Sequence, residues 1–177
     1  MAIWHEKFSL EHVISLRNNN LNKHLCIEFT ELGEDYIVAR MPVEDFTRQS
    51  RGILHGGASC VLAEALGSIA SHMCIDMRKQ KAVGLEINAN HVRPVSNGYV
   101  TGKTTVASLG RSVHVWNIDI RNDAGKMNCV SRLTTAIVNL KASVASVATG
   151  KHTIGVGASS SSCARLRVWR EWNATMP

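Results

Sequence analysis

The sequence lacks the features that mark several large classes of proteins. Its five cysteines include no C-x-x-C pair and its eight histidines show no metal-binding spacing, so neither a disulfide scaffold nor a metal site is indicated. The longest apolar stretch, residues 58–73, is interrupted by Glu64, Ser68 and His72, which excludes a membrane span there. Residues 1–10 contain no apolar run of signal-peptide length, and we therefore expect a cytoplasmic protein.

The sequence also has little net charge over most of its length. The formal net charge is +6, of which residues 1–140 contribute +2 and residues 141–177 contribute +4. A nearly neutral body gives no reason to expect a nucleic-acid-binding surface. We predict one domain over residues 1–140 and a basic, Ser/Ala/Gly-rich extension over residues 141–177, whose composition is typical of a disordered segment. A basic, Trp-bearing interaction segment around residues 165–172 is the alternative.

Hydrophobic periodicity predicts an α+β domain. Apolar residues recur at helical spacing over residues 57–73 and cover more than half of the helix circumference, so other structure must enclose this helix. Short turns between the last predicted strands indicate an antiparallel meander, with the long helix against one face of the sheet. The other predicted elements are a helix at 9–17, two strands at 25–32 and 36–41, and four strands at 81–92, 98–108, 112–122 and 126–140.

Glu64 lies in the middle of this apolar helix, where a carboxylate is costly to bury without partners. It is either a general base or nucleophile, or a residue at the helix edge that reaches solvent or a structural arginine. Ser68 follows one turn later on the same face and can hydrogen-bond the carboxylate or a water molecule beside it.

His55, Gly56 and Gly57 open the same helix. Glycine lets a ligand approach the backbone closely, and the first amides of a helix point outward at the positive end of its dipole, which suits a developing oxyanion. A plain helix entry through a tight turn is the alternative. Gly56 and Glu64 are separated by about 12 Å along a helix, too far to act on one carbonyl. If both are catalytic, they come from two subunits of an obligatory dimer with antiparallel central helices.

Four motifs occur along the chain in a fixed order. They are GILHGGAS at residues 52–59, LAE at 62–64, GLEINANHVRP at 84–94 and SRLTTAI at 131–137. Together they resemble the hotdog-fold acyl-CoA thioesterases, and within that family they are similar to the bacterial 1,4-dihydroxy-2-naphthoyl-CoA hydrolases of menaquinone synthesis. The resemblance implies a hotdog fold, in which an antiparallel sheet wraps around one long central helix. It also implies an enzyme that uses no metal and no redox cofactor.

The resemblance further implies roles for individual residues. Glu64 would attack the thioester carbonyl or activate water for that attack, with support from Ser68. The Gly56 amide would polarise the carbonyl, which Gln49 and His55 would help to place. The positions expected to contact coenzyme A are Gly84, His91, Val92, Arg93, Pro94, Ser108, Leu109, Gly110, Arg111, Ser112 and Val113. Arginines at such positions suit phosphate oxygens, although ordinary solvated turn charges would give the same pattern.

The function expected from these residues is hydrolysis of an aromatic acyl-CoA to the free acid and coenzyme A. The enzyme is expected to be a homo-oligomer with shared active sites, as a dimer or a dimer of dimers. Three alternatives stay open at this point. The enzyme could release misloaded groups from an aryl carrier protein, it could be a hydratase or dehydratase that uses His55 and Glu64 as acid and base, or the protein could be an acyl-CoA sensor without catalysis.

Overall fold

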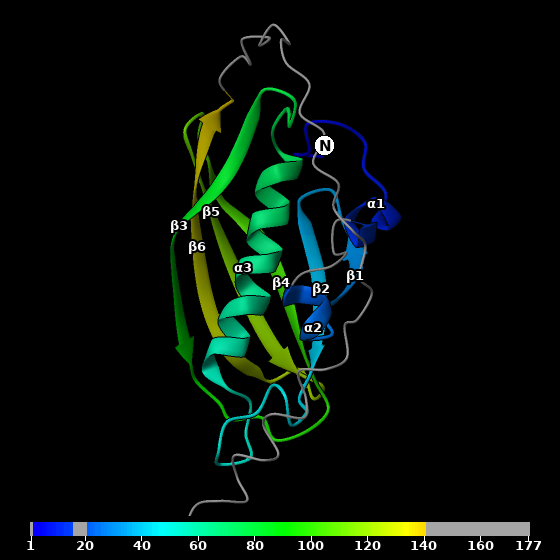
Figure 1. The fold of residues 1–177 in the computed structure, drawn as a ribbon, viewed down its shortest axis with the longest axis vertical. Coiled ribbons are helices and arrows are strands. Elements are labelled where there is room, and N and C mark those ends of the chain that lie inside the picture. The colour runs from blue at the N-terminus through cyan, green and yellow to red at the C-terminus, as the bar shows by residue number, and fades with distance from the viewer. Residues whose placement is uncertain (1, 16–20, 141–177) are drawn as a thin grey trace, which may run out of the picture. The chain divides into compact units, whose positions relative to one another are not determined.

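The computed structural model describes residues 2–15 and 21–140 (Figure 1). The predicted extension over residues 141–177 and the end of the first predicted helix lie outside the described residues. The helices are α1 (Leu10–Ser15), α2 (Leu21–His24) and α3 (Gly56–Met73), and the strands are β1 (Glu28–Leu32), β2 (Tyr36–Pro42), β3 (Gln80–His91), β4 (Tyr99–Leu109), β5 (Val113–Asn122) and β6 (Met127–Asn139). Within this part of the chain, no helix combines the length and the apolar character that crossing a membrane requires.

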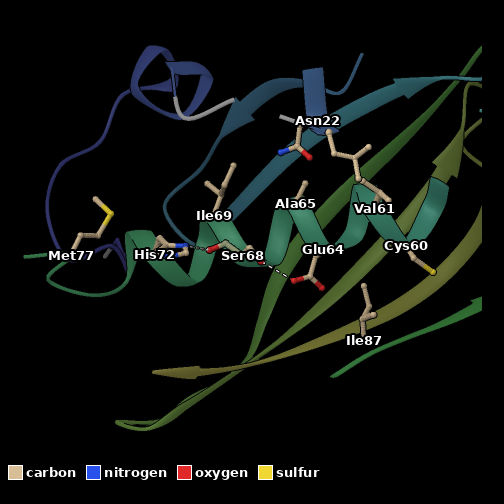
Figure 2. A pocket seen from close by; sticks show the side chains of 11 residues that line it. Asn22, Cys60, Val61, Glu64, Ala65, Ser68, Ile69, His72, Met77 and Ile87 are labelled. Carbon is tan, nitrogen blue, oxygen red and sulfur yellow. Dashed lines mark hydrogen bonds between the residues drawn. The ribbon is translucent and has the colours of Figure 1, made fainter. Parts of the chain in front are cut away.

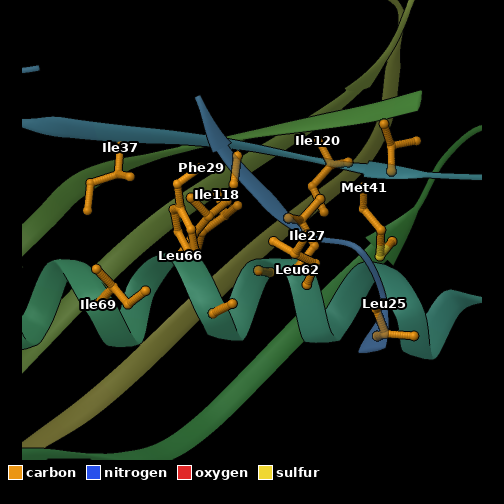
Figure 3. Packing of buried hydrophobic residues seen from close by; sticks show 14 of the residues in the cluster. Leu25, Ile27, Phe29, Ile37, Met41, Leu62, Leu66, Ile69, Ile118 and Ile120 are labelled. Atoms are coloured by element: carbon orange, nitrogen blue, oxygen red, sulfur yellow. The ribbon is translucent and has the colours of Figure 1, made fainter. Parts of the chain in front are cut away.

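The long helix α3 lies across one face of a six-stranded antiparallel sheet, as the sequence predicts (Figure 1). Leu62 and Leu66 are fully buried on its sheet-facing side and face Ile118 and Ile120 of β5 (Figure 3). The strands alternate buried and outward-facing residues, as in β5, so one face of the sheet is apolar and covered by the helix. The α+β class and the hotdog arrangement, a sheet wrapped around a central helix, are therefore confirmed.

The order of the strands corrects the predicted four-stranded meander. The sheet runs β1-β2-β4-β5-β6-β3, so only β4, β5 and β6 form a meander, while β3 pairs with β6 at the opposite edge from β1. The turn before β4 is short but does not close a hairpin. Val95 accepts a hydrogen bond from the Leu54 amide and Gly98 accepts one from the Val43 amide, so the segment after β3 crosses beneath the start of α3 instead. Turn length alone could not reveal this crossing.

A second difference concerns the predicted strand at residues 25–32, which begins only at Glu28. The preceding residues form α2, which the sequence reasoning missed. Cys26 adopts a left-handed backbone conformation with φ 52° and closes the turn after α2, while the Ile27 amide donates to the Asn22 carbonyl. This turn brings the side chain of Ile27 into the core, where it is fully buried. A non-glycine residue in this conformation leaves no clear signal in a sequence.

The contact between α3 and β6 depends on a glycine. A Cβ atom on Gly67 would lie 2.5 Å from Cδ2 and 3.2 Å from Cβ of Leu133, whose side chain is fully buried in the core and would have to shift. We expect Gly67→Ala to destabilise the protein, because overpacking of about 1–3 kcal/mol exceeds the gain in helix propensity of about 1 kcal/mol. Chemical denaturation measures the change in the free energy of unfolding. A more stable variant would contradict this account of the helix–sheet contact.

His114 provides a pH-dependent contribution to stability. It is 5% exposed, packs edge-on against Trp116, and its Nδ1 has no hydrogen-bond partner in the described structure. Burial lowers its pKa below the usual value. As the pH falls through about 6.5, His114 therefore takes up a proton in the unfolded chain while it stays neutral in the folded chain. This protonation favours the unfolded chain, so the free energy of unfolding decreases over that pH range. We expect His114→Phe to gain stability relative to the parent between pH 7.5 and pH 5 in denaturation curves; a constant difference would exclude this role.

Candidate functional site

A cavity of about 660 Å³ runs along the side of α3 that the sheet leaves uncovered (Figure 2). Between Ala58 and Met73, the residues of α3 that are not buried are Cys60, Val61, Glu64, Ser68 and His72. Four of these follow one another at a spacing of four residues and therefore lie along one stripe of the helix. The cavity is lined by Leu21, Asn22, Cys60, Val61, Glu64, Ala65, Ser68, Ile69, His72, Met77 and Ile87.

Glu64 presents the only carboxylate among these lining residues. Its Oε1 accepts a hydrogen bond of 3.1 Å from the Ser68 hydroxyl, the contact expected from their spacing. No ion pair found among the described residues includes Glu64. The carboxylate therefore has no cationic partner among the described residues, which speaks against a structural ion pair with an arginine, while its partial exposure leaves it open to solvent or a ligand.

The other polar members of the stripe differ in their chemistry. Burial raises the pKa of the Cys60 thiol, so this residue is a poor source of thiolate at neutral pH. His72 forms a hydrogen bond of 2.8 Å between its Nδ1 and the Ser68 carbonyl, which fixes the imidazole at the far end of the cavity from Cys60. The sequence analysis did not single out His72 as a site residue. The sequence signal that could have indicated it is its spacing, because Glu64, Ser68 and His72 follow one another at intervals of four residues.

Gly84 of β3 lies directly against the carboxylate of Glu64. A Cβ atom at this position would be 2.8 Å from Glu64 Oε1. The sequence reasoning assigned Gly84 to the coenzyme A contacts, whereas in the structure its nearest functional neighbour is the carboxylate. The missing side chain leaves space for the carboxylate beside β3.

The start of α3 forms a second polar centre. His55 is the N-cap residue, and its Nδ1 accepts the Gly57 amide at 2.8 Å, which places the ring proton on Nε2 when the imidazole is neutral. The Gly56 amide makes no backbone hydrogen bond to any residue that the structure describes. A Cβ atom on Gly56 would lie 2.7 Å from Nε2 of His91, so the end of β3 borders this amide. The Gly56 amide is thus free for a ligand oxygen.

Gln49 precedes this centre in the loop between β2 and α3. Its side-chain oxygen accepts the Arg51 amide at 2.8 Å, and its backbone amide donates to the Ile53 carbonyl. These bonds fold the loop that leads into α3. The structure therefore gathers Gln49, His55 and Gly56 near the helix N-terminus, and Glu64 and Ser68 two to three turns further along.

The positions predicted to contact coenzyme A divide into two groups in one subunit. The Arg93 amide donates to the carbonyl of Asn128 near the start of β6, whereas the Ser112 carbonyl accepts the Ile137 amide near its end. The two anchor points on β6, residues 128 and 137, are nine residue steps apart along the strand, which corresponds to about 30 Å. The segment at residues 91–94 and the turn at residues 108–113 therefore lie at opposite ends of the sheet.

These features define a class of protein, the hotdog-fold enzymes. An antiparallel sheet surrounds a central helix, a carboxylate lies in a cavity along that helix, and an open amide lies at the helix N-terminus. Comparison with known proteins agrees. The family model of the thioesterase superfamily matches residues 51–129. The chain is 46% identical over 136 residues to the 1,4-dihydroxy-2-naphthoyl-CoA hydrolase of Escherichia coli, covering 77% of this chain and 99% of that protein.

Two further similarities extend this result. The chain is 43% identical over 136 residues to the proofreading thioesterase EntH of Cronobacter turicensis, covering 77% of this chain and 98% of the relative. The crystal structure of a Haemophilus influenzae thioesterase superimposes with a TM-score of 0.76 at 46% identity, covering 80% of this chain and 99% of that one. The chain belongs to the thioesterase superfamily and is a thioester hydrolase.

The contact between Gly84 and Glu64 gives a test of the site. We expect Gly84→Ala to lower kcat by about tenfold or more, because the carboxylate must move away from the new methyl group and small displacements of a reacting group are costly. Stability should change little, since a flexible carboxylate end can shift. Thiol release measures kcat and thermal unfolding measures stability. The control is Thr105→Ala, an exposed position of β4, which pairs with β2 and β5 away from the β3 edge and should keep the parental rate. An unchanged rate in Gly84→Ala would refute the proximity argument.

Proposed function

We propose that this protein hydrolyses an aromatic acyl-CoA thioester, with Glu64 as the reactive carboxylate and the Gly56 amide as the group that polarises the carbonyl. The observation that carries the proposal is the position of Glu64. Its carboxylate has a serine hydroxyl as hydrogen-bond partner and projects into a mainly aliphatic cavity large enough for a fused-ring acyl group. The similarity to the Escherichia coli hydrolase supports 1,4-dihydroxy-2-naphthoyl-CoA as the substrate and menaquinone synthesis as the pathway.

The shape of the cavity supports an aromatic acyl group with polar substituents. From Glu64 to His72 the cavity extends along two turns of α3, or about 12 Å. Ile69 forms an apolar wall between these polar ends, and Ile87 adds an apolar wall beside Glu64 on the side toward Cys60 (Figure 2). A fused ring would pack against the walls while a ring hydroxyl reaches the imidazole. A short acyl group such as acetyl would leave most of this length unfilled.

The chemistry follows from the two polar centres. The carbonyl oxygen of the thioester accepts the Gly56 amide at the positive end of the helix, which stabilises the negative charge that develops on that oxygen. Glu64 either attacks the carbonyl carbon directly or takes a proton from the attacking water, and Ser68 holds the carboxylate in place. When Glu64 acts as a base, the carbon–sulfur bond breaks, the proton that Glu64 took passes to the leaving sulfur, and the acid is released. When Glu64 attacks directly, the thiolate leaves and takes a proton from solvent, and a water molecule then hydrolyses the mixed anhydride on Glu64 to release the acid.

The distance between the two centres requires two subunits in this proposal. Gly56 and Glu64 lie on one straight helix about 12 Å apart, so Glu64 of one subunit must meet Gly56 of another. The position of β3 supports such a dimer, because it ends the sheet order and presents the half-exposed Val83 and Leu85. Pairing of two β3 edges would set two α3 helices antiparallel. Association of two dimers is a further expectation.

Aryl carrier protein thioesters are a second candidate substrate, which the similarity to the proofreading thioesterase EntH favours. Both carriers present the acyl group on the same phosphopantetheine arm, so the reacting centre would be identical. Comparison of kcat/KM for the same aryl group on coenzyme A and on a carrier protein distinguishes them. We expect the higher value with coenzyme A.

Mixing two inactive variants tests the shared site. Glu64→Gln removes the reactive carboxylate. Gly56→Pro removes the amide N–H at a position where proline is tolerated, because Gly56 is the first helical residue and His55 before it has an extended backbone. We expect each variant alone to lose at least 100-fold in kcat and a refolded equimolar mixture to recover about a quarter of the parental rate, because half of the dimers then contain one intact site.

Two controls sharpen this experiment. Gly56→Ala adds a side chain against His91 but keeps the amide, so it should lose much less activity than Gly56→Pro. The double variant with both changes in one chain should give no recovery when mixed with either single variant. A mixture that stays inactive would contradict the shared site, and parental activity of Glu64→Gln would overturn the role of Glu64 itself.

A further inference from the structure

Asn128, the second residue of β6, fastens the segment that follows β3. The backbone carbonyl of Asn128 accepts two hydrogen bonds, from the Val92 amide at 2.9 Å and the Arg93 amide at 3.2 Å. Its side-chain Nδ2 donates to the carbonyl of Arg93. The backbone of Arg93 is therefore held on both sides by one residue of a neighbouring strand.

The environment of Asn128 indicates that the stability of the fold alone does not explain an asparagine at this position. The residue is 4% exposed, and its Oδ1 is buried without a hydrogen-bond partner in the described structure. A buried carbonyl oxygen that has lost water and gained no donor is unfavourable. An aliphatic side chain of similar volume would avoid that loss. What the asparagine supplies is the N–H donor directed at the Arg93 carbonyl.

The fastened segment lies between the reacting centre and solvent. On one side is His91, whose ring borders the Gly56 amide; on the other is Val95, whose carbonyl accepts the Leu54 amide in the loop that leads into α3. Arg93 between them is exposed. Because His91 pairs with Cys129 in the β3–β6 ladder and Val95 is held by Leu54, the contacts of Asn128 act mainly on Arg93 between them.

We infer that Asn128 is a positioning residue that orients Arg93 toward the phosphates of the coenzyme A portion of the substrate. This inference rests on the proposed function, which places the thioester carbonyl at Gly56 and the nucleotide end of the substrate outside the cavity. The guanidinium of Arg93 binds phosphate oxygens best from a fixed direction, because its donors have a rigid planar geometry. Because its amide and its carbonyl are both hydrogen-bonded to Asn128, the backbone of Arg93 has a fixed direction from which the side chain projects.

The test compares Asn128→Leu and Asn128→Ala with the parent on two substrates, benzoyl-CoA and the benzoyl thioester of N-acetylcysteamine, which lacks the nucleotide and its phosphates. Leucine keeps the number and branching of the side-chain heavy atoms and removes the donor, and Asn128→Ala removes the donor without adding bulk; we expect both variants to fold. We expect KM for benzoyl-CoA to rise about tenfold, as for loss of a well-placed hydrogen bond to a charged group, with kcat within twofold. The short thioester should show kcat/KM within twofold of the parent.

Ser131→Ala is the matched control. Its hydroxyl also donates from β6 to a β3 carbonyl, that of Asn88 at 2.6 Å, but in the middle of the strand and away from Arg93. This variant should keep the parental KM for benzoyl-CoA, whereas an equal rise would mean that any loosening of β3 has the same effect.

A double-mutant cycle with Arg93→Ala decides whether Asn128 acts through the arginine. We expect Asn128→Leu to have no further effect on KM once Arg93 is absent. The inference would be overturned if the effects of the two substitutions on KM were fully additive. It would also be overturned if Asn128→Leu lowered kcat/KM for the short thioester as much as for benzoyl-CoA, or if it lowered kcat at constant KM. If the proposed function itself is wrong, the result is different, because the parent protein then releases no thiol from benzoyl-CoA.

Discussion

Burial of α3 against the sheet is the constraint on which the rest of this structure depends. The helix is apolar over more than half of its circumference, and the concave face of the sheet covers that part with residues such as Trp116 and Leu133. The buried hydroxyl of Ser71 meets the Trp116 indole N–H at 2.6 Å and the Thr135 hydroxyl at 2.8 Å, so even the polar atoms of this contact are paired. The packing fixes the rotation of α3 about its own axis and so determines which of its residues stay uncovered.

The uncovered residues include the proposed functional ones, because the packing buries the rest of the helix. Glu64, Ser68 and His72 occupy the stripe that faces the cavity, and Gly84 of β3 leaves space for the carboxylate. A carboxylate on the buried side of α3 would have been prohibitively costly, and one on a fully exposed helix would have been an ordinary solvated charge. The partly covered stripe is the intermediate environment in which a carboxylate can remain both accessible and reactive.

The sequence predicted the elements of this fold well and their pairing less well. The long helix was predicted to within one residue of its start, and each strand after it to within two residues at either end, because turns and alternating apolar residues mark such boundaries locally. The pairing of β3 with β6 was missed, because the crossing beneath α3 depends on hydrogen bonds of Val95 and Gly98 to distant segments. The cost of a carboxylate in an apolar helix and the glycines at the helix start drew attention to Glu64 and Gly56, and the resemblance then implied their roles. The positions of His72 and Asn128 became meaningful only through tertiary contacts.

Two separations within one subunit together determine how a complete site is assembled. The reactive carboxylate and the open amide are about 12 Å apart on one helix, and the two groups of predicted coenzyme A contacts are about 30 Å apart along β6. A straight helix and a paired strand cannot bend to close either gap. In the proposed dimer, an antiparallel partner would close the first gap by presenting its helix N-terminus beside Glu64. The turn that carries Arg111 lies at the end of β6 away from Arg93, so a coenzyme A molecule held by both arginines would also lie between subunits. In the proposed assembly, oligomer formation is thus a geometric requirement of catalysis and of substrate binding alike.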